Sequence, residues 1–202
     1  MTLAAQSILS QHDALSAARR AMIDSQLRVS GINQDWLLAA MARIPREDYV
    51  PVQARGHAYI DRAIPIDRAH ALPAPLVQAM LLAEAAPLAG DRVLVISQSG
   101  YLSALVEPMV QSVETVDAAG ALALQSKALF SLILIDGAIE ALPGNLIAAL
   151  TETGRVVTGL VLRGVTRLAA GSKSGGTVAL GPLAEVGIPV LGEFAAPQVW
   201  SF

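Results

Sequence analysis

Two acidic residues follow predicted strands, at the positions where α/β sheets bind polar ligands. Asp117 comes directly after the predicted strand of residues 112–116, and Asp136 comes directly after the predicted strand of residues 131–135. The carboxyl ends of parallel strands lie along one edge of a sheet, and ligands bind in the crevice outside that edge. A carboxylate placed there accepts hydrogen bonds from a ligand. Two structural interpretations stay open: Asp117 also fits the N-cap of the next helix, and Asp136 with Gly137 also fits a plain turn.

A polar turn with a single glycine follows another predicted strand, residues 92–96. The turn reads Ser97-Gln98-Ser99-Gly100-Tyr101 and leads into a predicted helix. A glycine at this point permits a positive φ angle and a close approach of the backbone to a ligand. The same turn also fits an ordinary strand-to-helix connection. It is no nucleophile elbow of a hydrolase, because the pattern Gly-x-Ser-x-Gly is missing.

Other common chemistries find no support in the residue pattern. The three histidines, His57 and His70 among them, show no metal-ligand spacing, so we expect no metal site. The chain has no cysteine, which excludes thiolate chemistry and disulfides. Residues 171–176 (Gly-Ser-Lys-Ser-Gly-Gly) lead into no predicted helix, which favours a flexible hairpin tip over a phosphate-binding loop.

Charge and hydropathy exclude several classes of partner. With a net charge of −3 and a pI of about 5.6, we expect no surface for nucleic acid or anionic lipid. No apolar run reaches the roughly 20 residues of a membrane helix. Residues 1–11 lack the basic and apolar regions of a signal peptide. We therefore expect a soluble, cytoplasmic protein.

The low content of charged residues has two interpretations. Hydrophobic residues make up 53% of the chain and charged residues 15%, against averages of about 45–50% and about 25%. Much of the excess is alanine, which fits an Ala-rich helical surface. Because monomers rarely expose large apolar patches, the excess also fits a buried subunit interface. The second interpretation predicts a homo-oligomer, and we carry that expectation forward.

Periodicity predicts N-terminal helices followed by a parallel sheet. Helices are expected at residues 13–29, with Gly31 as the stop, and at residues 35–43, before irregular, Pro-punctuated chain over residues 49–66. Short strands then alternate with short helices, which is typical of βαβ units within an α/β fold. We expect a single domain over residues 1–202, divided into residues 1–75 and a core of residues 76–202. The expected helices are 76–86, 101–110, 119–129 and 145–150, and the expected strands are 92–96, 112–116, 131–135 and 155–160, with a closing hairpin of 165–169 and 177–180.

Several stretches, in a consistent order along most of the chain, carry a family resemblance. They are residues 22–32 (MIDSQLRVSGI), 37–41 (LLAAM), 44–51 (IPREDYVP), 58–61 (AYID), 64–66 (IPI), 90–94 (GDRVL), 130–137 (FSLILIDG) and 154–157 (GRVV). These stretches resemble the protein-L-isoaspartate O-methyltransferase family. The resemblance implies a class I methyltransferase fold, a Rossmann-like and mostly parallel sheet that ends in an antiparallel hairpin, with an N-terminal helical segment. It also implies S-adenosylmethionine as cofactor and L-isoaspartyl or D-aspartyl residues of a protein as substrate.

The cofactor motifs of that family are only partly present. The family pattern is an acidic residue, then Gly-x-Gly-x-Gly and an aromatic residue, whereas here Val95 takes the acidic position and the turn is one residue shorter. At the end of the next strand the family places an acid that binds the ribose hydroxyls, and Asp117 matches it. By resemblance, the residual cofactor-binding residues are Ser97, Gln98, Ser99, Gly100, Tyr101, Asp117 and Asp136.

The adenine side and the acceptor side also depart from the family. The family inserts a strand and a Gly-Asp-Gly loop where residues 118–130 have room for one helix only, so we expect one edge strand to be missing. The family segment Thr-Ile-Ser-Gln-Pro aligns with residues 71–75, whose Ala-Leu-Pro-Ala-Pro offers no side-chain hydrogen bond. No catalytic residue is identified; the resemblance places Tyr59, Asp61 and Pro73 on the acceptor side.

Three functions remain open on the sequence alone. The first, which we favour, is a pseudoenzyme or scaffold that has lost most of its S-adenosylmethionine binding. The second is an active protein carboxyl methyltransferase with a reorganised cofactor site. The third is a module that binds a small ligand in the old active-site cleft.

Overall fold

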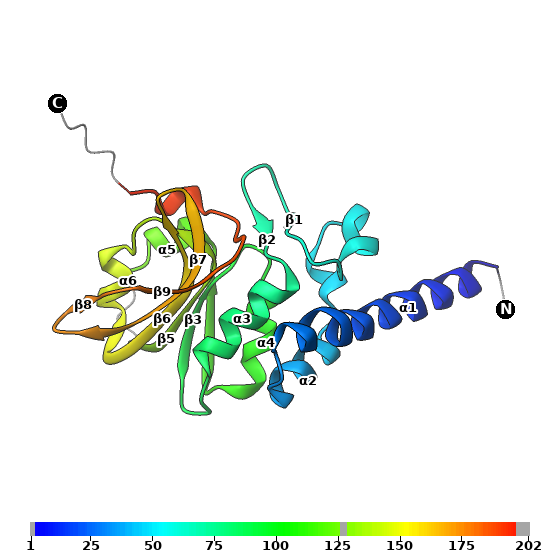
Figure 1. The fold of residues 1–202 in the computed structure, drawn as a ribbon, viewed down its shortest axis with the longest axis horizontal. Coiled ribbons are helices and arrows are strands. Elements are labelled where there is room, and N and C mark those ends of the chain that lie inside the picture. The colour runs from blue at the N-terminus through cyan, green and yellow to red at the C-terminus, as the bar shows by residue number, and fades with distance from the viewer. Residues whose placement is uncertain (1–2, 126–128, 197–202) are drawn as a thin grey trace.

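A computed structural model of the chain describes residues 3–125 and 129–196. Helices flank a twisted sheet in which the strand order is β4-β3-β5-β6-β7 (Figure 1). The parallel strands are β3 (Arg92–Ile96), β4 (Ser112–Val116), β5 (Phe130–Ile139) and β6 (Leu150–Leu162). Strand β7 (Val165–Ser174) pairs antiparallel with β6, which confirms the expected class I methyltransferase fold.

The expected missing strand is borne out at the β4 edge. Strand β4 pairs with β3 on one side, and within residues 3–125 and 129–196 no strand pairs with its other side. Between β4 and β5, the described residues form the short helix α5 (Ala118–Leu122), which ends well before the expected residue 129. The sheet therefore stops one strand earlier than the family resemblance would place it.

The N-terminal helix is longer than its sequence signals indicated. Helix α1 (Leu3–Met22) starts ten residues before the expected residue 13 and continues into a π-helical turn, Ile23–Leu27, and a 3-10 turn, Arg28–Ser30. Gly31 then ends the helix with a φ of 87°, as expected, because glycine adopts the left-handed conformation without steric cost. Helix α2 (Asp35–Arg43) has its expected bounds.

The segment expected to be irregular contains two 3-10 helices and a small hairpin. The 3-10 helices are Arg46–Tyr49 and Val52–His57, and the hairpin joins β1 (Ile64–Pro65) to β2 (Ala71–Leu72). Helix α3 (Pro75–Ala85) follows at once. Its first residue is proline, which suits a helix start because the N–H that proline lacks would have no intrahelical partner there.

The remaining helices are shorter than expected, strands β3 and β4 have their expected bounds, and strands β5, β6 and β7 are longer than expected. Helix α4 (Tyr101–Val106) gives way to the 3-10 turn Glu107–Met109, since Pro108 removes a backbone donor. Helix α6 is confined to Gly144–Ala148. Strands β5 and β6 each extend beyond the apolar runs that predicted them, because their ends pair with neighbouring chain rather than bury further apolar side chains.

The expected antiparallel hairpin is present as β7 and β8 (Thr177–Val178), with a longer first strand and a shorter second strand than expected. The main antiparallel hairpin joins β6 to β7 through a turn at Arg163 and Gly164, whose φ angles are 53° and 78°. Residues 171–174 belong to β7, so only Gly175 and Gly176 form the turn to β8. A further strand, β9 (Gly181–Glu185), pairs with β7 and was not expected at all.

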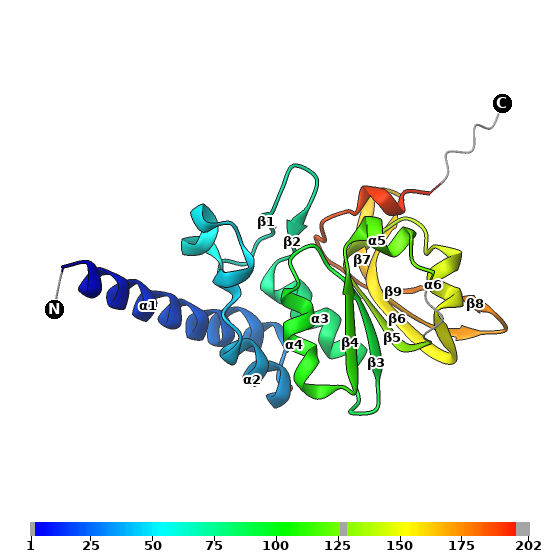
Figure 2. The same cartoon turned by 180° about the vertical axis from the view of Figure 1, so that it is seen from behind.

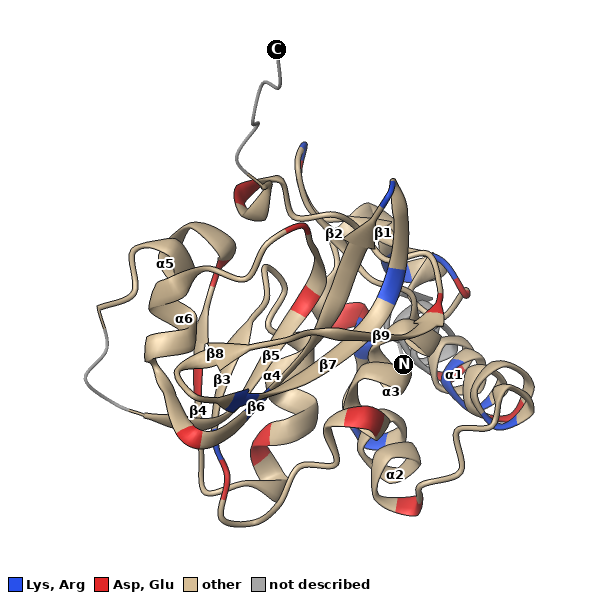
Figure 3. Ribbon diagram, turned by 60° about the vertical axis from the view of Figure 1, so that its left-hand side comes forward, with Lys and Arg blue, Asp and Glu red and all other residues tan. Residues whose placement is uncertain are grey.

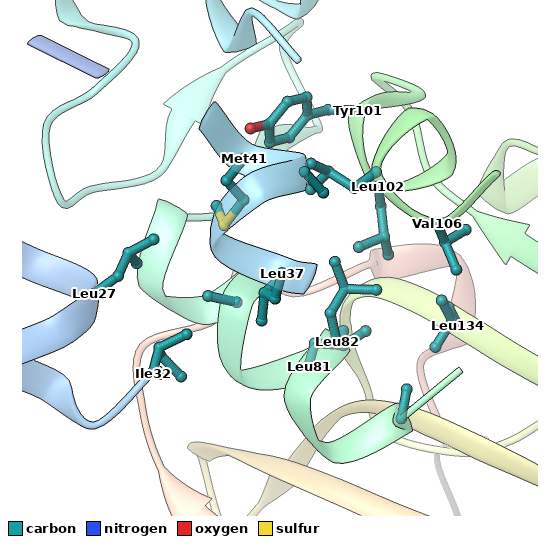
Figure 4. Packing of buried hydrophobic residues seen from close by; sticks show 14 of the residues in the cluster. Leu27, Ile32, Leu37, Met41, Leu81, Leu82, Tyr101, Leu102, Val106 and Leu134 are labelled. Atoms are coloured by element: carbon teal, nitrogen blue, oxygen red, sulfur yellow. The ribbon is translucent and has the colours of Figure 1, made fainter. Parts of the chain in front are cut away.

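The N-terminal helices pack on the sheet through a shared apolar core. Figure 4 shows Leu37 and Met41 of α2 facing Leu82 of α3 and Tyr101 of α4. All four side chains are buried, and each buried residue of this size contributes about 1.5–3 kcal/mol. Charged residues of both signs are visible on α1 and α2, and the strands carry few of them (Figure 3).

No helix within the described residues is both long enough and apolar enough to cross a membrane.

Candidate functional site

The carboxyl ends of β3 and β5 bring Ser97 and Asp136 together. These strands pair in parallel with Ile96 opposite Ile135, so the residues that follow each meet at the sheet edge. Ser97 Oγ donates a hydrogen bond of 2.8 Å to Asp136 Oδ2, and both residues are buried. The edge that the sequence singled out therefore carries a buried carboxylate and a hydroxyl in direct contact.

The turn after β3 satisfies its own backbone donors. Gly100 N donates to Ser97 Oγ at 3.2 Å, and Tyr101 N donates to Ser99 Oγ at 3.1 Å. Gly100 has a φ of 77°, which an L residue with a side chain rarely adopts. The two serine hydroxyls thus accept hydrogen bonds from the amides at the start of helix α4.

A buried polar chain connects Asp136 to the N-terminal segment. Gln78 Nε2 donates to Asp136 Oδ1 and Oδ2 at 2.9 and 3.0 Å, and Gln78 Oε1 accepts from Arg46 Nη1. The guanidinium of Arg46 also donates to the backbone oxygens of Ala58 at 2.8 Å and Pro73 at 2.5 Å. Gln78 and Arg46 are fully buried, so the two charged groups are joined through one amide.

Burial shifts the protonation equilibria of both charged ends of this chain. Burial raises the pKa of Asp136, while the hydrogen bonds from Gln78 and Ser97 and the positive charge of Arg46 oppose that rise. Burial lowers the pKa of Arg46 to about 10, and the negative charge of Asp136 is among the influences that oppose the fall. Arg46 therefore stays charged near neutral pH, and Gln78 links it to Asp136.

Tyr101, which the family resemblance placed on the cofactor, lies in the core instead. Its ring centroid is 5.2 Å from the Arg46 Cζ atom and 5.2 Å from the ring centroid of Tyr49. The Tyr101 hydroxyl is buried and finds no hydrogen-bond partner among the described residues. The aromatic ring stabilises the buried guanidinium through a cation–π contact.

A small pocket opens between this sheet edge, the β1–β2 hairpin and the C-terminal segment. Its free space is about 10 Å³, the room of a single water molecule. The described residues that line it are Ile66, His70, Ala71, Ile96, Ser97, Gln98, Ser99, Ala118, Asp136 and Leu191. Four of the residues singled out from the sequence meet here, namely Ser97, Gln98, Ser99 and Asp136.

Asp117 caps a helix outside that lining. Its Oδ1 atom accepts a hydrogen bond of 2.6 Å from Gly120 N, so the carboxylate is the N-cap of α5. The side chain is exposed to solvent. The structural interpretation of Asp117 as an N-cap is therefore confirmed, and whether a ligand also uses it stays a prediction.

His70 bridges two carboxylates at the rim of the pocket. Its Nδ1 atom lies 2.8 Å from Asp67 Oδ2, and its Nε2 atom lies 2.7 Å from Glu193 Oε1. Hydrogen bonds to Asp67 and Glu193 raise the pKa of His70, and the hydrogen bond from His70 lowers the pKa of Asp67. A backbone hydrogen bond and then the contact with His70 lower the pKa of Glu193. Within the described chain, no three His, Asp or Glu side chains gather as a metal-ligand set.

Comparison with known proteins identifies the family. The model described as Protein-L-isoaspartate(D-aspartate) O-methyltransferase (PCMT) matches residues 17–118. A protein-L-isoaspartate O-methyltransferase 2 of Anaeromyxobacter sp. is 33% identical over 165 residues, which cover 69% of this chain and 68% of that protein. The chain belongs to the protein-L-isoaspartate O-methyltransferase family.

Two further relatives show how much of the family's length is matched. The enzyme named protein-L-isoaspartate O-methyltransferase in Roseiflexus castenholzii is 42% identical over 113 residues, or 55% of this chain and 51% of the relative. Its namesake in Koribacter versatilis is 32% identical over 170 residues, or 71% and 76%. The chain thus spans only about half the length of the first of these relatives.

Solved members of the family share the fold. A protein-L-isoaspartate O-methyltransferase of Plasmodium falciparum, solved with S-adenosyl-L-homocysteine, aligns with a TM-score of 0.70 at 18% identity and covers 89% of this chain and 98% of that one. A second protein-L-isoaspartate O-methyltransferase structure aligns with a TM-score of 0.69 at 16% identity and covers 88% and 67%. At these identities the likeness establishes the architecture alone.

The residues on the family's acceptor side lie away from the pocket. The Tyr59 hydroxyl donates to Glu47 and accepts from Arg19 Nε at 2.6 Å, so it belongs to a structural network. Pro73 offers its carbonyl to Arg46, and Asp61 is exposed beside a separate groove with Val186. None of Tyr59, Asp61 or Pro73 is among the described residues that line the pocket.

Sequence reasoning missed Gln78, Arg46 and Glu193. Gln78 carried a usable signal, because it is the one uncharged polar residue in an otherwise apolar helical run and falls on its buried face. A buried amide needs hydrogen-bond partners, so its position indicated a polar network. Glu193 gave no such signal, since its contact with His70 spans 123 positions of sequence.

Proposed function

We propose that this chain is a member of the protein-L-isoaspartate O-methyltransferase family with lost or strongly weakened S-adenosylmethionine binding. In this role it is a pseudoenzyme that binds or scaffolds another protein. The narrow pocket at the carboxyl ends of β3 and β5 carries the proposal, because its free space of about 10 Å³ holds one water molecule and would have to widen to admit a nucleoside.

The residues around the pocket do not fit the cofactor in this form. The amides of Gly100 and Tyr101 already donate to serine hydroxyls, and Leu191 fills the space beside Gly137. The strand and loop that would flank β4 are missing from the described residues. Each hydrogen bond lost to a ligand costs about 1–3 kcal/mol, so several losses together weaken binding by about 10³-fold or more.

The acceptor side supports the same conclusion. Methyl transfer depends mainly on holding the donor and the acceptor carboxylate in a reactive arrangement. Residues 71–75 provide no side-chain donor for a carboxylate, and the Pro73 carbonyl is engaged by Arg46. Loss of polar groups for both the cofactor and the acceptor carboxylate impairs methyl transfer more than loss for either one alone.

An active methyltransferase is the second candidate function. It is favoured by the exposed Asp117 at the end of β4 and by the names of the relatives, one of which was solved with S-adenosyl-L-homocysteine. In that case the cofactor would supply the methyl group, and isoaspartyl carboxylates would be the acceptors. The small-ligand module is the third candidate, and it requires the pocket to open first.

Cytoplasmic location and self-association complete the proposal. The proposal of a homo-oligomer rests on the low content of charged residues, 15% of the chain, which fits a buried subunit interface. Light scattering at tens of micromolar protein tests this, and a monomer mass would contradict it.

Calorimetry with S-adenosylhomocysteine separates the first two functions. The Roseiflexus castenholzii relative, titrated in parallel, is the positive control. We expect no heat of binding for this chain with millimolar ligand. A dissociation constant tighter than about 100 μM, a free energy near −5.5 kcal/mol, would instead support the active enzyme. Methyl ester formation on an isoaspartyl peptide would support it independently.

A further inference from the structure

The C-terminal segment, residues 188–196, runs across the carboxyl end of β5. Leu191 N donates to Ala138 O at 2.9 Å, and Ala138 N donates to Pro189 O at 2.7 Å. Further along, Glu140 N donates to Phe194 O at 3.1 Å. Figure 2 shows this red segment passing above α5, on the side of the sheet that also holds the β1–β2 hairpin. The segment therefore covers the edge where the pocket lies.

Two apolar side chains anchor the segment over the pocket. Leu191 lies directly above Gly137, since a Cβ atom at that glycine would come within 2.6 Å of Leu191 Cγ. Phe194 is 2% exposed and belongs to the same buried cluster as Ala118 and Ala121 of α5. Leu191 also lines the pocket. The segment is thus the outer wall of the pocket, and the lack of a side chain at Gly137 makes room for it.

A polar contact ties this wall to the opposite rim. Glu193 Oε1 lies 2.7 Å from His70 Nε2, and His70 sits in the β1–β2 hairpin, where Asp67 holds its other ring nitrogen. The side chains of His70 and Glu193 are 15% and 27% exposed. The contact joins the β1–β2 hairpin to the C-terminal segment, two segments that both line the pocket.

The wall is attached more weakly than the sheet behind it. Strands β5 and β6 pair along most of their length, whereas residues 188–196 make one isolated bridge at Ala138 and hydrogen bonds to Glu140 and Ala141 just beyond β5. Segments held by few hydrogen bonds and few apolar anchors open locally, at a free energy well below that of global unfolding.

We propose that residues 188–196 form a strap that opens and closes the pocket between β3, β5 and α5, with the contact between His70 and Glu193 as its latch. Any ligand of the pocket binds only the open form. Its observed association constant is therefore the intrinsic constant multiplied by the fraction of open molecules. The inference does not depend on which ligand enters, and it stands whether or not S-adenosylmethionine binding is lost.

The charges around the latch give it a pH dependence. Asp67 and Glu193 are the charged groups in contact with His70, and the neutral Gln98 touches Asp67. Their hydrogen bonds raise the pKa of His70. The latch is therefore complete below the usual histidine pKa and is lost as the pH rises through the raised value, because a neutral ring donates to only one of the two carboxylates.

Single cysteines report on strap opening, because the chain contains no cysteine of its own. Ala118→Cys places a thiol beneath the strap, Ala119→Cys places one on the exposed face of the same helix, and Ala79→Cys places one in the core. The rate of labelling by a maleimide is measured for each, together with the melting temperature. Dividing by the Ala119→Cys rate at each pH removes the intrinsic pH dependence of thiol reactivity.

Closure predicts intermediate labelling for the reporter at position 118. The thiol at position 118 should react with the maleimide more slowly than the thiol at position 119 and faster than the thiol at position 79. Adding Glu193→Gln should speed labelling at 118 about five-fold, the effect of a latch worth roughly 1 kcal/mol, and leave labelling at 79 unchanged. Adding Leu191→Ala instead should increase the labelling rate at position 118 further. Raising the pH through the titration of His70 should increase that rate as Glu193→Gln does.

Three outcomes would overturn the strap. Labelling at 118 as fast as at 119 in the unaltered background would mean that nothing covers the pocket. Labelling at 118 as slow as at 79 in every background would mean that the segment opens only by global unfolding. Equal labelling rates at position 118 with and without Glu193→Gln would show that the contact between His70 and Glu193 does not hold the strap closed.

Discussion

Ser97 and Asp136 meet across the carboxyl ends of β3 and β5, with Ser97 Oγ donating to Asp136 Oδ2 at 2.8 Å. The carboxylate also accepts from Gln78, and Gln78 accepts from Arg46. This edge is where the fold places ligands, yet here its polar groups are bonded to one another. The polar groups of this site are buried and hydrogen-bonded to one another, as polar groups in a protein interior are.

Asp136→Asn should change how stability depends on pH. Burial raises the pKa of Asp136 above its usual 3.8, so the folded state binds this proton more tightly than the unfolded state. The stabilisation is complete below pH 3.8 and is lost as the pH rises through the raised value. Urea unfolding across acid and neutral pH should show the free energy of the unaltered protein falling relative to Asp136→Asn. A rise with pH would mean that the donors outweigh burial.

Gln78→Met should destabilise the fold strongly. Methionine matches the length of glutamine but leaves Arg46 Nη1 and both Asp136 oxygens without this partner. Breaking a link between buried charges costs about 3 kcal/mol. Gln98→Met is the matched control, because Gln98 is exposed, and it should change the unfolding free energy by less than about 0.5 kcal/mol. Equal effects of both substitutions would show that the buried chain is not needed for stability.

The sheet could be predicted from the sequence because its signals are local. The β-branched run of β3 and the apolar run of β5 are buried on both faces, and such runs read as strands without knowledge of their neighbours. Gly31 likewise ended its helix as expected, because its positive φ is a property of one residue. The expectation of a missing edge strand followed from the family resemblance together with the short length of residues 118–130.

The candidate site depended on contacts that sequence periodicity does not encode. The pocket wall comes from residues 188–196, a Pro- and Gly-containing stretch with no regular pattern, and its partners lie far away in sequence. Strand β9 was missed for the same reason, since Gly181 and Pro182 oppose a strand assignment and only pairing with β7 decides it. Tyr101 was placed on the cofactor by family position, whereas its packing beneath Arg46 is a tertiary property.

Gly137→Ala should displace the C-terminal segment. The added Cβ would come within 2.6 Å of Leu191 Cγ, so the leucine must move or the segment must shift. Overpacking of this kind costs about 1–3 kcal/mol. Gly144→Ala is the control, since a Cβ there meets nothing within 4 Å and alanine favours helix α6. Thermal unfolding should show a lower melting temperature for the first variant only, and an unchanged value for Gly137→Ala would mean that Leu191 is not held over this glycine.

Asp117→Ala should cost about 1 kcal/mol through the loss of an N-cap. Asp117 Oδ1 accepts from Gly120 N at 2.6 Å, and no other side chain caps α5 among the described residues. Asp117→Ser should restore most of that loss, because serine caps helices about as well as aspartate. Urea unfolding of both variants measures this, and S-adenosylhomocysteine titrations of the same proteins test the second role. Suppose that the unaltered chain bound S-adenosylhomocysteine, and that Asp117→Ser regained stability but did not bind it. The carboxylate would then serve a cofactor as well as the helix. We expect Asp117→Ala to lose stability and the unaltered chain to show no binding of S-adenosylhomocysteine. That result would leave Asp117 with its structural role alone.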